Sequence, residues 1–350
     1  MLGSADDRLF LDSGAFSVWT QGAEIDVEVY ADFCSQNPEV SYYVNLDAIP
    51  GRAGQSRTRS AIAIEDACER GWRNYQAMLR KLPIDKVIPV FHRGETGKWL
   101  KKMIDFGAPY IGIGQAVNFG SKANQKKWLD GLADVIVDGA GRPRVKTHGF
   151  AVTSFQLMKH FPWHSVDSTS WLKQAAFGTV YVPKMADKDA PYSDVPMLIN
   201  VSPKSPSRDK KQQHIDNLSP ILKEYTLDYF RSIKAPLGET EVVKVPSKYK
   251  KKKEELWYDK TKTSVIRELV PGLATDHQRR FRANAIFISK VEIGVKRIYF
   301  AGGEGSIIDP VEYRLKNRLM SYHKVGMKTG NLANKTFNNW RHQIGAHSET

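Results

Sequence analysis

The sequence predicts an α/β protein, a (β/α)8 TIM-like barrel with a basic insertion before the last strand. Short β-rich segments recur along the first half of the chain, and stretches with helical spacing separate them. Parallel strands need long crossovers, which helices supply, so this alternation favours parallel β/α units. A doubly wound open sheet is the structural rival. No glycine-rich phosphate loop follows the first predicted strand, however, where such folds commonly keep one.

Eight segments are predicted strands because each is apolar and ends in a polar residue or glycine. They are residues 8–14, 41–49, 86–94, 109–115, 144–150, 163–169, 178–183 and 296–303, with one further candidate at 284–292. Helical spacing predicts helices over residues 27–34, 59–80, 97–106, 125–137 and 154–160. Eight such units fit a barrel, for which about 250 residues is typical.

A proline-rich stretch with a lysine run interrupts this rhythm from residue 185 to about residue 282. One helix is predicted inside it, from about Gln212 to Ile233. We therefore expect three parts. Residues 1–184 form the first part of the catalytic barrel, and residues 185–282 form a basic insertion that binds nucleic acid. Residues 283–350 hold the last barrel strand or strands and a helical, basic C-terminal segment.

Composition excludes several classes of protein. Hydrophobic residues make up 41% of the chain and charged residues 26%, which excludes a largely disordered protein. No apolar run approaches the roughly 20 residues that cross a bilayer, and the first ten residues do not resemble a secretory signal. Two cysteines, Cys34 and Cys68, exclude a disulfide scaffold and a Cys-rich zinc site. We expect a cytoplasmic protein with no membrane partner, no metal and no cofactor.

The positive charge is concentrated in the second half. Residues 1–183 carry 21 Lys and Arg against 19 Asp and Glu, whereas residues 184–350 carry 31 against 19. This asymmetry suggests a catalytic body beside a region that faces a polyanion. The densest run includes Lys250, Lys251, Lys252 and Lys253, with aromatic residues nearby, a mixture that fits phosphate contacts and base stacking. A solvated, solubilising loop explains this run equally well.

Polar side chains stand where the apolar strands are predicted to stop. In a barrel these positions share one rim, the C-terminal face, where active sites of this fold lie. An aspartate at one strand end is commonly a turn former, but three at the ends of apolar strands are costly to bury without a use. The residues are Asp12, Asp47, His92, Gln115, His148 and Asp167.

These positions lie in motifs that resemble the tRNA-guanine transglycosylase superfamily. LDSGAFS at Leu11–Ser17 resembles its DSGGFQ motif, and VNLDAIP at Val44–Pro50 resembles its base-recognition segment. VFHRG and GIGQA stand where the family has VQG and IGG segments, and HSVDSTSW at His164–Trp171 is similar to its nucleophile segment. The motifs occur in the family's order over residues 8–175. They are most similar to the DpdA-type DNA guanine transglycosylases of phages and bacterial genomic islands.

The resemblance implies a pentosyltransferase that exchanges guanine in DNA for a free 7-deazaguanine, 7-cyano-7-deazaguanine in this branch. It implies that Asp167 is the nucleophile at C1′ and that Asp12 is the general acid and base. Asp47 would accept the guanine N1–H and 2-amino donors, and Phe16 would stack on the base. His92 replaces a glutamine that contacts the base carbonyl.

The other implied contacts are weaker or depart from the family. Ser13 and Ser168 would orient the two catalytic carboxylates, and His148 would line the base pocket. Gly114 would admit the 7-substituent, and Gln115, in place of a glycine, would alter which substituent fits. Lys173 follows the nucleophile where the tRNA enzymes have arginine, which weakens the expectation of anticodon recognition. The family's Cys3His zinc subdomain has no counterpart in the sequence.

Three other functions stay open on the sequence. The nearest is a tRNA-guanine transglycosylase with the same chemistry. A glycoside hydrolase barrel would also use paired carboxylates, but it gives no reason for the basic second half. A non-catalytic nucleic-acid-binding protein would use only the basic half. Phe16 and His92 also have structural readings, as a core aromatic and a hydrogen-bonded histidine.

Overall fold

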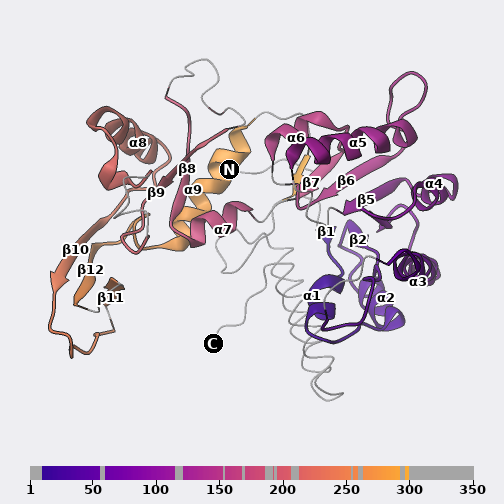
Figure 1. Ribbon diagram of the computed structural model, residues 1–350, viewed down its shortest axis with the longest axis horizontal. Coiled ribbons are helices and arrows are strands. Elements are labelled where there is room, and N and C mark those ends of the chain that lie inside the picture. The colour runs from indigo at the N-terminus through magenta and orange to yellow at the C-terminus, as the bar shows by residue number, and fades with distance from the viewer. Residues whose placement is uncertain are drawn as a thin grey trace. The chain divides into compact units, whose positions relative to one another are not determined.

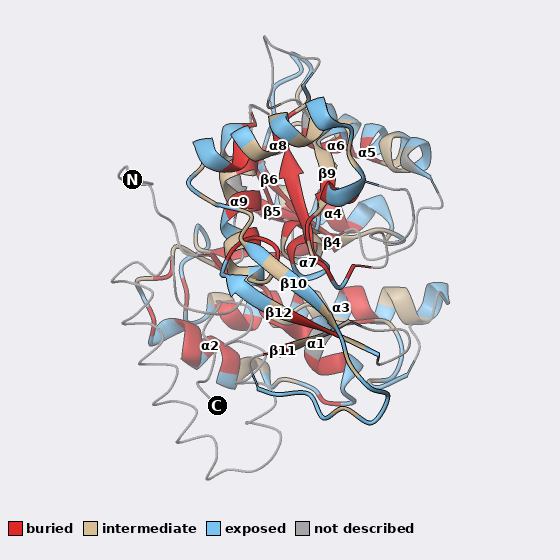
Figure 2. Cartoon of the chain, turned by 90° about the vertical axis from the view of Figure 1, so that its left-hand side faces the viewer, coloured by how far each residue is buried: buried red, intermediate tan, exposed pale blue. Residues whose placement is uncertain are grey.

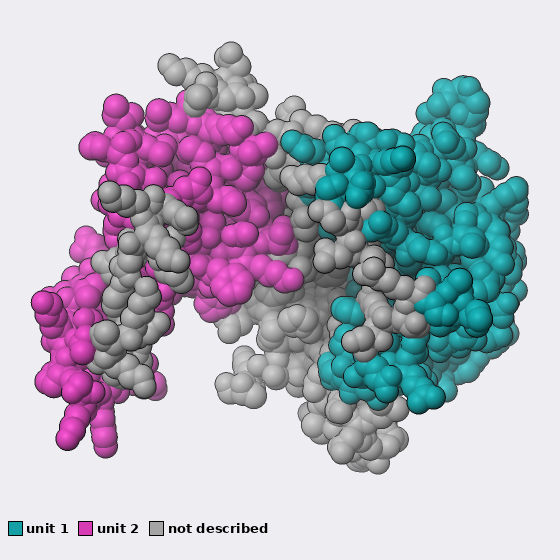
Figure 3. Space-filling model, viewed as in Figure 1, with its two compact units in different colours: residues 1–168, 295–350 teal, residues 169–294 magenta. Residues whose placement is uncertain are grey.

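The computed structural model divides the chain into two compact units, coloured separately in Figure 3. The first comprises residues 1–168 and 295–350, and the second comprises residues 169–294. The residues that the structure describes are 10–55, 60–114, 121–152, 154–167, 170–185, 192, 195–205, 213–253, 255–258, 263–291 and 296–298. The predicted mixed α/β class with parallel strands is confirmed.

Parallel strands form the centre of the first unit. One sheet has the order β1–β2–β3 and another the order β13–β7–β6–β5–β4, and every pairing is parallel. Pro89 alone separates β3 from β4. It has no N–H for the ladder, although its carbonyl accepts the Gly112 N–H at 2.8 Å, so one predicted strand becomes two short ones. The strands are β1 (Phe10–Leu11), β2 (Tyr42–Val44), β3 (Val87–Ile88), β4 (Val90–His92), β5 (Tyr110–Gly114), β6 (Lys146–Phe150), β7 (Ser165–Asp167) and β13 (Lys296–Ile298).

Helices connect these strands along the chain, as Figure 1 shows. All five helices predicted in this half are present, and α1 is an additional one. Asp26 caps α2 by accepting the Glu28 N–H at 2.8 Å, and Ser121 caps α5 by accepting the Asn124 N–H at 3.2 Å. The helices are α1 (Ala15–Thr20), α2 (Val27–Ser35), α3 (Ala61–Leu79), α4 (Gly97–Asp105), α5 (Lys122–Ile136) and α6 (Phe155–His160).

The strand pairings among the described residues give two parallel sheets and do not by themselves show a closed barrel. The segment predicted as a barrel strand at 178–183 is indeed a strand, β8 (Thr179–Val182), but it belongs to the second unit. There it pairs antiparallel with β9 (Met197–Asn200), so its assignment to the parallel set was wrong. A short continuous apolar strand is buried in either kind of sheet, and its sequence does not say which.

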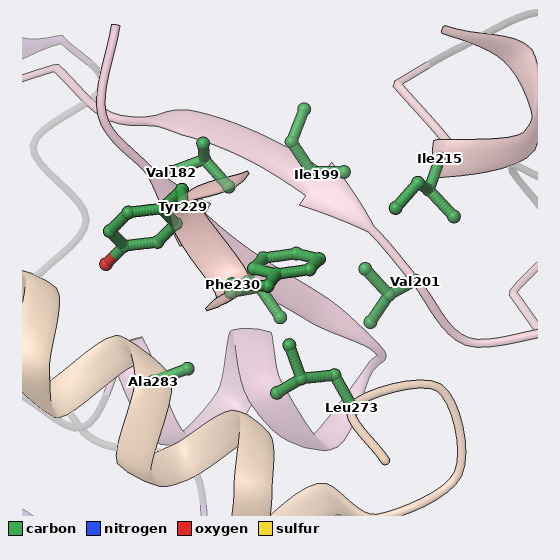
Figure 4. Close-up of a cluster of buried hydrophobic side chains, with 9 residues drawn as sticks. Val182, Ile199, Val201, Ile215, Tyr229, Phe230, Leu273 and Ala283 are labelled. Atoms are coloured by element: carbon green, nitrogen blue, oxygen red, sulfur yellow. The ribbon is translucent and has the colours of Figure 1, made fainter. Parts of the chain in front are cut away.

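A separate hydrophobic core holds the second unit together, as Figure 4 shows. Val182, Ile199 and Phe230 meet in it, from β8, β9 and α8 (Pro220–Ser232). The helix predicted over 212–233 is therefore present but starts later. Ser219 caps it and Pro220 opens it, while a 3-10 turn, η2 (Ile215–Asn217), precedes it.

The strand candidate at 284–292 is wrong, because α9 (His277–Lys290) covers most of it. The Asp276 side chain caps this helix by accepting the Gln278 N–H at 2.8 Å. Asn284 is fully buried and accepts the Tyr181 N–H of β8 at 2.8 Å. Its amide also donates to the Trp171 carbonyl of α7 (Ser170–Ala176) at 3.1 Å. The Asn284 side chain therefore ties α9 to the backbones of β8 and α7.

A second sheet of this unit is unlike the parallel strands. β10 (Glu239–Lys244), β12 (Ser264–Val270) and β11 (Glu255–Tyr258) pair antiparallel in that order. Figure 2 shows β10 largely exposed, whereas every residue of β5 is buried. These strands were not predicted, because charged residues interrupt them and the prediction relied on short apolar segments.

Two general findings concern the described part of the chain. It holds no helix that is both long and apolar enough to cross a bilayer. Across the same residues, no group of three or more His, Cys, Asp or Glu side chains is arranged to hold a metal ion.

Candidate active site

Asp12 directly follows β1, in a turn that glycine makes possible. Gly14 has φ +68°, in the left-handed region that glycine enters without strain. The backbone N–H groups of Ser13 and Gly14 donate to the Asp12 carboxyl. Burial, followed by the charges of Asp47 and Asp167, nevertheless raises the pKa of Asp12 from 3.8 to about 7. Asp47, after β2, and Asp167, at the end of β7, are therefore both near enough to act on Asp12.

Asp47 lies in the loop after β2 and meets His92 at the end of β4. The distance from His92 Nε2 to Asp47 Oδ2 is 2.6 Å. His92 pairs in register with Gly114 of β5, and a Cβ built on Gly114 would lie 2.3 Å from His92 Nδ1. Glycine at position 114 thus makes room for the imidazole beside Asp47, a different task from the predicted contact with a 7-substituent.

Asp167 ends β7 and is buried. Its Oδ1 accepts the N–H of Ala151, the residue after β6. Ala151 has φ +54°, a left-handed backbone conformation that is uncommon outside glycine. Backbone conformations of this kind cost energy and cluster at functional sites. Here the conformation of Ala151 directs its N–H toward the Asp167 carboxylate.

His148 does not stand at a strand end, so that prediction was wrong. It lies in the middle of β6, because the ladder to β5 continues through Gly149 and Phe150. Its side chain is fully buried. Nδ1 lies 2.7 Å from Ser165 Oγ, and Nε2 lies 3.9 Å from Asp167 Oδ2. The structure brings His148 to the predicted nucleophile, which the sequence did not anticipate.

The remaining predicted residues of this unit have separate surroundings. Phe16 on α1 is 50% exposed, which argues against the core reading of this aromatic. Ser13 is buried, and its Oγ accepts the Ala15 N–H at 3.4 Å. Gln115 and Ser168 lie outside the described residues.

Glu95 is a carboxyl near the site that the sequence reading missed. Burial raises its pKa to about 7, against the opposing effect of nearby His92. The Cys68 thiol donates to Glu95, and both line a cavity of about 20 Å³ with Asp47 and His92. The sequence offered one signal for Glu95: it lies three residues after His92, just past the end of β4.

The predicted nucleic-acid-binding lysines lie on the second unit. Lys250 to Lys253 are exposed in the loop between β10 and β11, and Lys173 is exposed on α7. The buried Glu255 organises this loop. Its carboxylate accepts the Lys252 N–H at 2.9 Å, the Tyr249 hydroxyl at 3.0 Å and Arg267 Nε at 3.2 Å. The loop therefore has a folded base, which a merely solvated lysine run does not need.

The first unit holds one carboxyl, Asp12, that two others influence, and the second unit holds a lysine loop with a folded base. Carboxyls placed near one another at strand ends suit acid–base and nucleophilic chemistry, and exposed lysines suit a polyanionic ligand. Comparison with known proteins adds no relative: no protein-family model, curated protein or solved structure matches this chain.

Proposed function

We propose that this protein exchanges guanine in DNA for a free 7-deazaguanine base through a covalent Asp167–deoxyribose intermediate. The main support is that Asp12, with a pKa of about 7, lies within reach of the charges of Asp47 and Asp167. Glycosyl transfer with retention needs one carboxyl that can carry a proton near neutral pH and a second that attacks. The motif resemblance assigns these roles to the same residues.

In the first step the Asp167 carboxylate attacks C1′ of the target nucleotide. A bond forms between an Asp167 oxygen and C1′ as the C1′–N9 bond breaks, and the electron pair of that bond leaves with guanine. Asp12 donates its proton to the departing base. Guanine leaves as a neutral molecule, and Asp12 becomes a carboxylate.

In the second step the 7-deazaguanine takes the place of guanine. Its N9 attacks C1′ while the bond between Asp167 and C1′ breaks, and the N9 proton passes to Asp12. Asp167 is again a carboxylate and Asp12 is again protonated. Two displacements at C1′ give net retention, and the reaction needs no metal or redox partner in this scheme.

Base recognition falls to Asp47, His92 and Phe16. Guanine offers donors at N1 and the 2-amino group, which suit the Asp47 carboxylate. His92, with Nε2 2.6 Å from Asp47 Oδ2, stands beside that carboxylate and can contact the same base. Phe16 presents a half-exposed ring, as stacking on a base requires. The incoming 7-deazaguanine has the same donors, so one pocket serves both bases.

We propose further that the parallel strands of the first unit belong to a (β/α)8 barrel. Side chains from strands that are not hydrogen-bonded neighbours meet in its interior. The ring centroids of Phe10 on β1 and His148 on β6 are 4.5 Å apart, and those of Tyr42 on β2 and Tyr110 on β5 are 5.2 Å apart. Inward-facing side chains of distant strands meet in this way in a closed or strongly curved sheet.

DNA is the proposed macromolecular substrate, and the lysine loop is its proposed phosphate contact. A base pair hides C1′ and the guanine edge, so the target guanine must be single-stranded or flipped out, at a cost of a few kcal/mol. Exposed lysines on a folded loop supply affinity for the backbone without reading its sequence. The reaction is assigned to the cytoplasm, where DNA and free bases are both present.

The test is incorporation of labelled guanine into defined nucleic acids. Purified protein is incubated with 14C-guanine and single-stranded DNA, duplex DNA or unmodified tRNA, and acid-insoluble label is counted. Label is expected in DNA. Label in tRNA alone would replace the DNA proposal with the tRNA alternative, and label in neither would reject base exchange.

A matched pair of variants separates chemistry from folding. Asp167→Asn keeps the size of the side chain but removes the nucleophile, so label incorporation is expected to fall below detection. Asp134→Asn makes the same change at an exposed position of α5 and is expected to leave incorporation unchanged. Equal activity of the two variants would reject the role of Asp167.

A further inference from the structure

The imidazole of His148 is held in one orientation in the interior of the first unit. Its ring contacts both Phe10 and Phe150, with both pairs of ring centroids 4.5 Å apart. The side chain is fully buried, so water does not compete for its nitrogens. Its polar contacts are with Ser165 and Asp167 of β7, and the Tyr110 hydroxyl of β5 is hydrogen-bonded to Ser165.

A hydroxyl pair fixes one nitrogen of the ring. Ser165 Oγ lies 2.7 Å from His148 Nδ1 and is also hydrogen-bonded to the Tyr110 hydroxyl. When the Tyr110 hydroxyl donates to Ser165, the Ser165 hydroxyl donates to Nδ1, and the ring proton resides on Nε2. The opposite arrangement would turn a lone pair of Nε2 toward a carboxylate, which is repulsive.

The other nitrogen faces the predicted nucleophile. His148 Nε2 lies 3.9 Å from Asp167 Oδ2, and no described residue forms a hydrogen bond with this buried atom. Buried polar atoms without a partner are rare in folded proteins and call for an explanation. Asp167 Oδ1 is already held by the N–H of Ala151. One carboxylate oxygen therefore has a backbone donor, and the second has an imidazole close by.

We propose that His148 is a positioning residue that donates Nε2–H to Asp167 Oδ2 during base exchange. This inference rests on the proposed function, because it assigns a task within the Asp167 ester intermediate. A shift of under 1 Å by either side chain would bring the 3.9 Å contact to hydrogen-bond length. No proton is transferred: the N–H orients the carboxylate before attack and supports its returning charge as the ester breaks.

The Nε2–H donor of His148 matters most if the substrate sugar is deoxyribose. Ribose carries a 2′-hydroxyl that can donate a hydrogen bond, and deoxyribose does not. A carboxylate that attacks deoxyribose must therefore find its donors in the protein. Ala151 and His148 supply one donor for each oxygen of Asp167, from β6 and the residue directly after it.

Three substitutions at one position test the inference. Gln places an amide nitrogen near the position of Nε2, Asn places one near Nδ1, and Phe keeps a flat ring without a donor. We expect His148→Gln to retain exchange within about tenfold of the wild type. His148→Asn and His148→Phe are expected to lose about a hundredfold in kcat with KM for DNA unchanged, the usual effect of removing one preorganised donor.

The covalent intermediate gives a second measurement. Protein quenched in acid during turnover is analysed by intact mass for the DNA adduct of Asp167. His148→Phe is expected to form and discharge this adduct more slowly than the wild type. His160→Gln, at an exposed histidine of α6 beside Asp130, is the matched control and is expected to behave as the wild type.

The outcomes separate this inference from the proposed function. A wild type that neither exchanges bases nor forms an adduct would reject both. An active wild type with fully active Asn and Phe variants would reject only the role of His148, as would a Gln variant no better than Phe. If His148→Phe fails to fold, Ser165→Ala decides: it frees Nδ1 without touching the ring and is expected to lower kcat about tenfold without raising KM.

Discussion

Two carboxyls with opposite pKa shifts, one in each unit, show how the same chemical group serves different ends. Glu255 of the second unit accepts hydrogen bonds from Lys252, Tyr249 and Arg267, and these bonds hold its pKa below the ordinary value. Asp12 of the first unit accepts backbone N–H groups too, but burial and the charges of Asp47 and Asp167 raise its pKa to about 7. A carboxyl surrounded by donors stabilises a loop, whereas one placed among like charges can exchange a proton at neutral pH.

The largest expected difference between the two carboxyls is in catalysis. Asp12→Asn should lower the rate of base exchange by about a hundredfold to ten-thousandfold, because the amide can neither donate the proton to guanine nor take it back. Glu255→Gln should change kcat by less than about threefold, since Glu255 lies in the other unit and touches no reacting atom in the proposed scheme. Steady-state kinetics with labelled guanine compares them, and equal losses in kcat would erase the distinction.

The second difference is the sign of the pH dependence of stability. The pKa of Asp12 is raised in the folded state, so its contribution is intact below about pH 4 and is lost as the pH rises through 7. Asp12→Asn removes the titrating group and therefore this loss of stability, which is a few kcal/mol of unfolding free energy at pH 8. Its melting temperature should therefore exceed that of the wild type by more at pH 8 than at pH 5. A constant difference across this range would contradict the raised pKa.

Glu255 should show the opposite sign. Its pKa is lowered, so its contribution is present above the ordinary carboxyl value and is lost on acidification. Glu255→Gln should destabilise the protein at pH 7, because Arg267 and the Lys252 N–H lose a charged acceptor. The difference from the wild type should shrink toward pH 3. Chemical denaturation at several pH values measures it, and a gap that widened in acid would argue against the assigned role.

Glycine variants test how tightly the rim of the first unit is packed. Gly114→Ala places a methyl group 2.3 Å from His92 Nδ1, so His92 must move away from Asp47. We expect about 1–3 kcal/mol of destabilisation and a raised KM for the free base. Gly97→Ala is the control, because nothing lies within 4 Å of its added carbon. Identical effects of the two variants on KM would separate His92 from base recognition.

The smallest effect is expected in the lysine loop. Lys251→Ala should weaken binding equally to DNA of any sequence and reduce the slope of log K against log salt by about 1. Lys101→Ala, at an exposed lysine of α4 in the first unit, serves as the matched control. Fluorescence anisotropy at several salt concentrations measures both. An unchanged slope for Lys251→Ala would reject the phosphate contact and favour a solubilising role for the loop.

Most of the first unit was predictable from local patterns. The helices α2 to α6 follow from apolar spacing and the strands from short apolar runs, because each element buries one side against its neighbours. The second unit was harder. β10 is largely exposed, charged residues interrupt both β10 and β12, and the apolar run in α9 fits a strand until the Asp276 cap is considered.

The sequence predicts only those residues of the candidate site whose side-chain type and position at a strand end indicate a function. Asp12, Asp47 and Asp167 stand at strand ends, which parallel topology brings together. The role of Ala151 is invisible in the sequence, since it acts through a backbone N–H that every residue except proline carries. The role of His148 depends on which face of β6 it occupies and on Ser165 two residues before Asp167 in the next strand. Contacts of this kind can be predicted only when the register between neighbouring strands is known.

The pairing of β13 with β7 gives the proposed nucleophile, Asp167, an unusual place in the order of synthesis. Residues 296–298 lie beside Ser165–Asp167, so the outer neighbour of β7 leaves the ribosome only after the whole second unit. Until then a nascent chain carries all three acids but an open strand edge next to Asp167. Completion of the candidate site would then be one of the last events in the maturation of this protein.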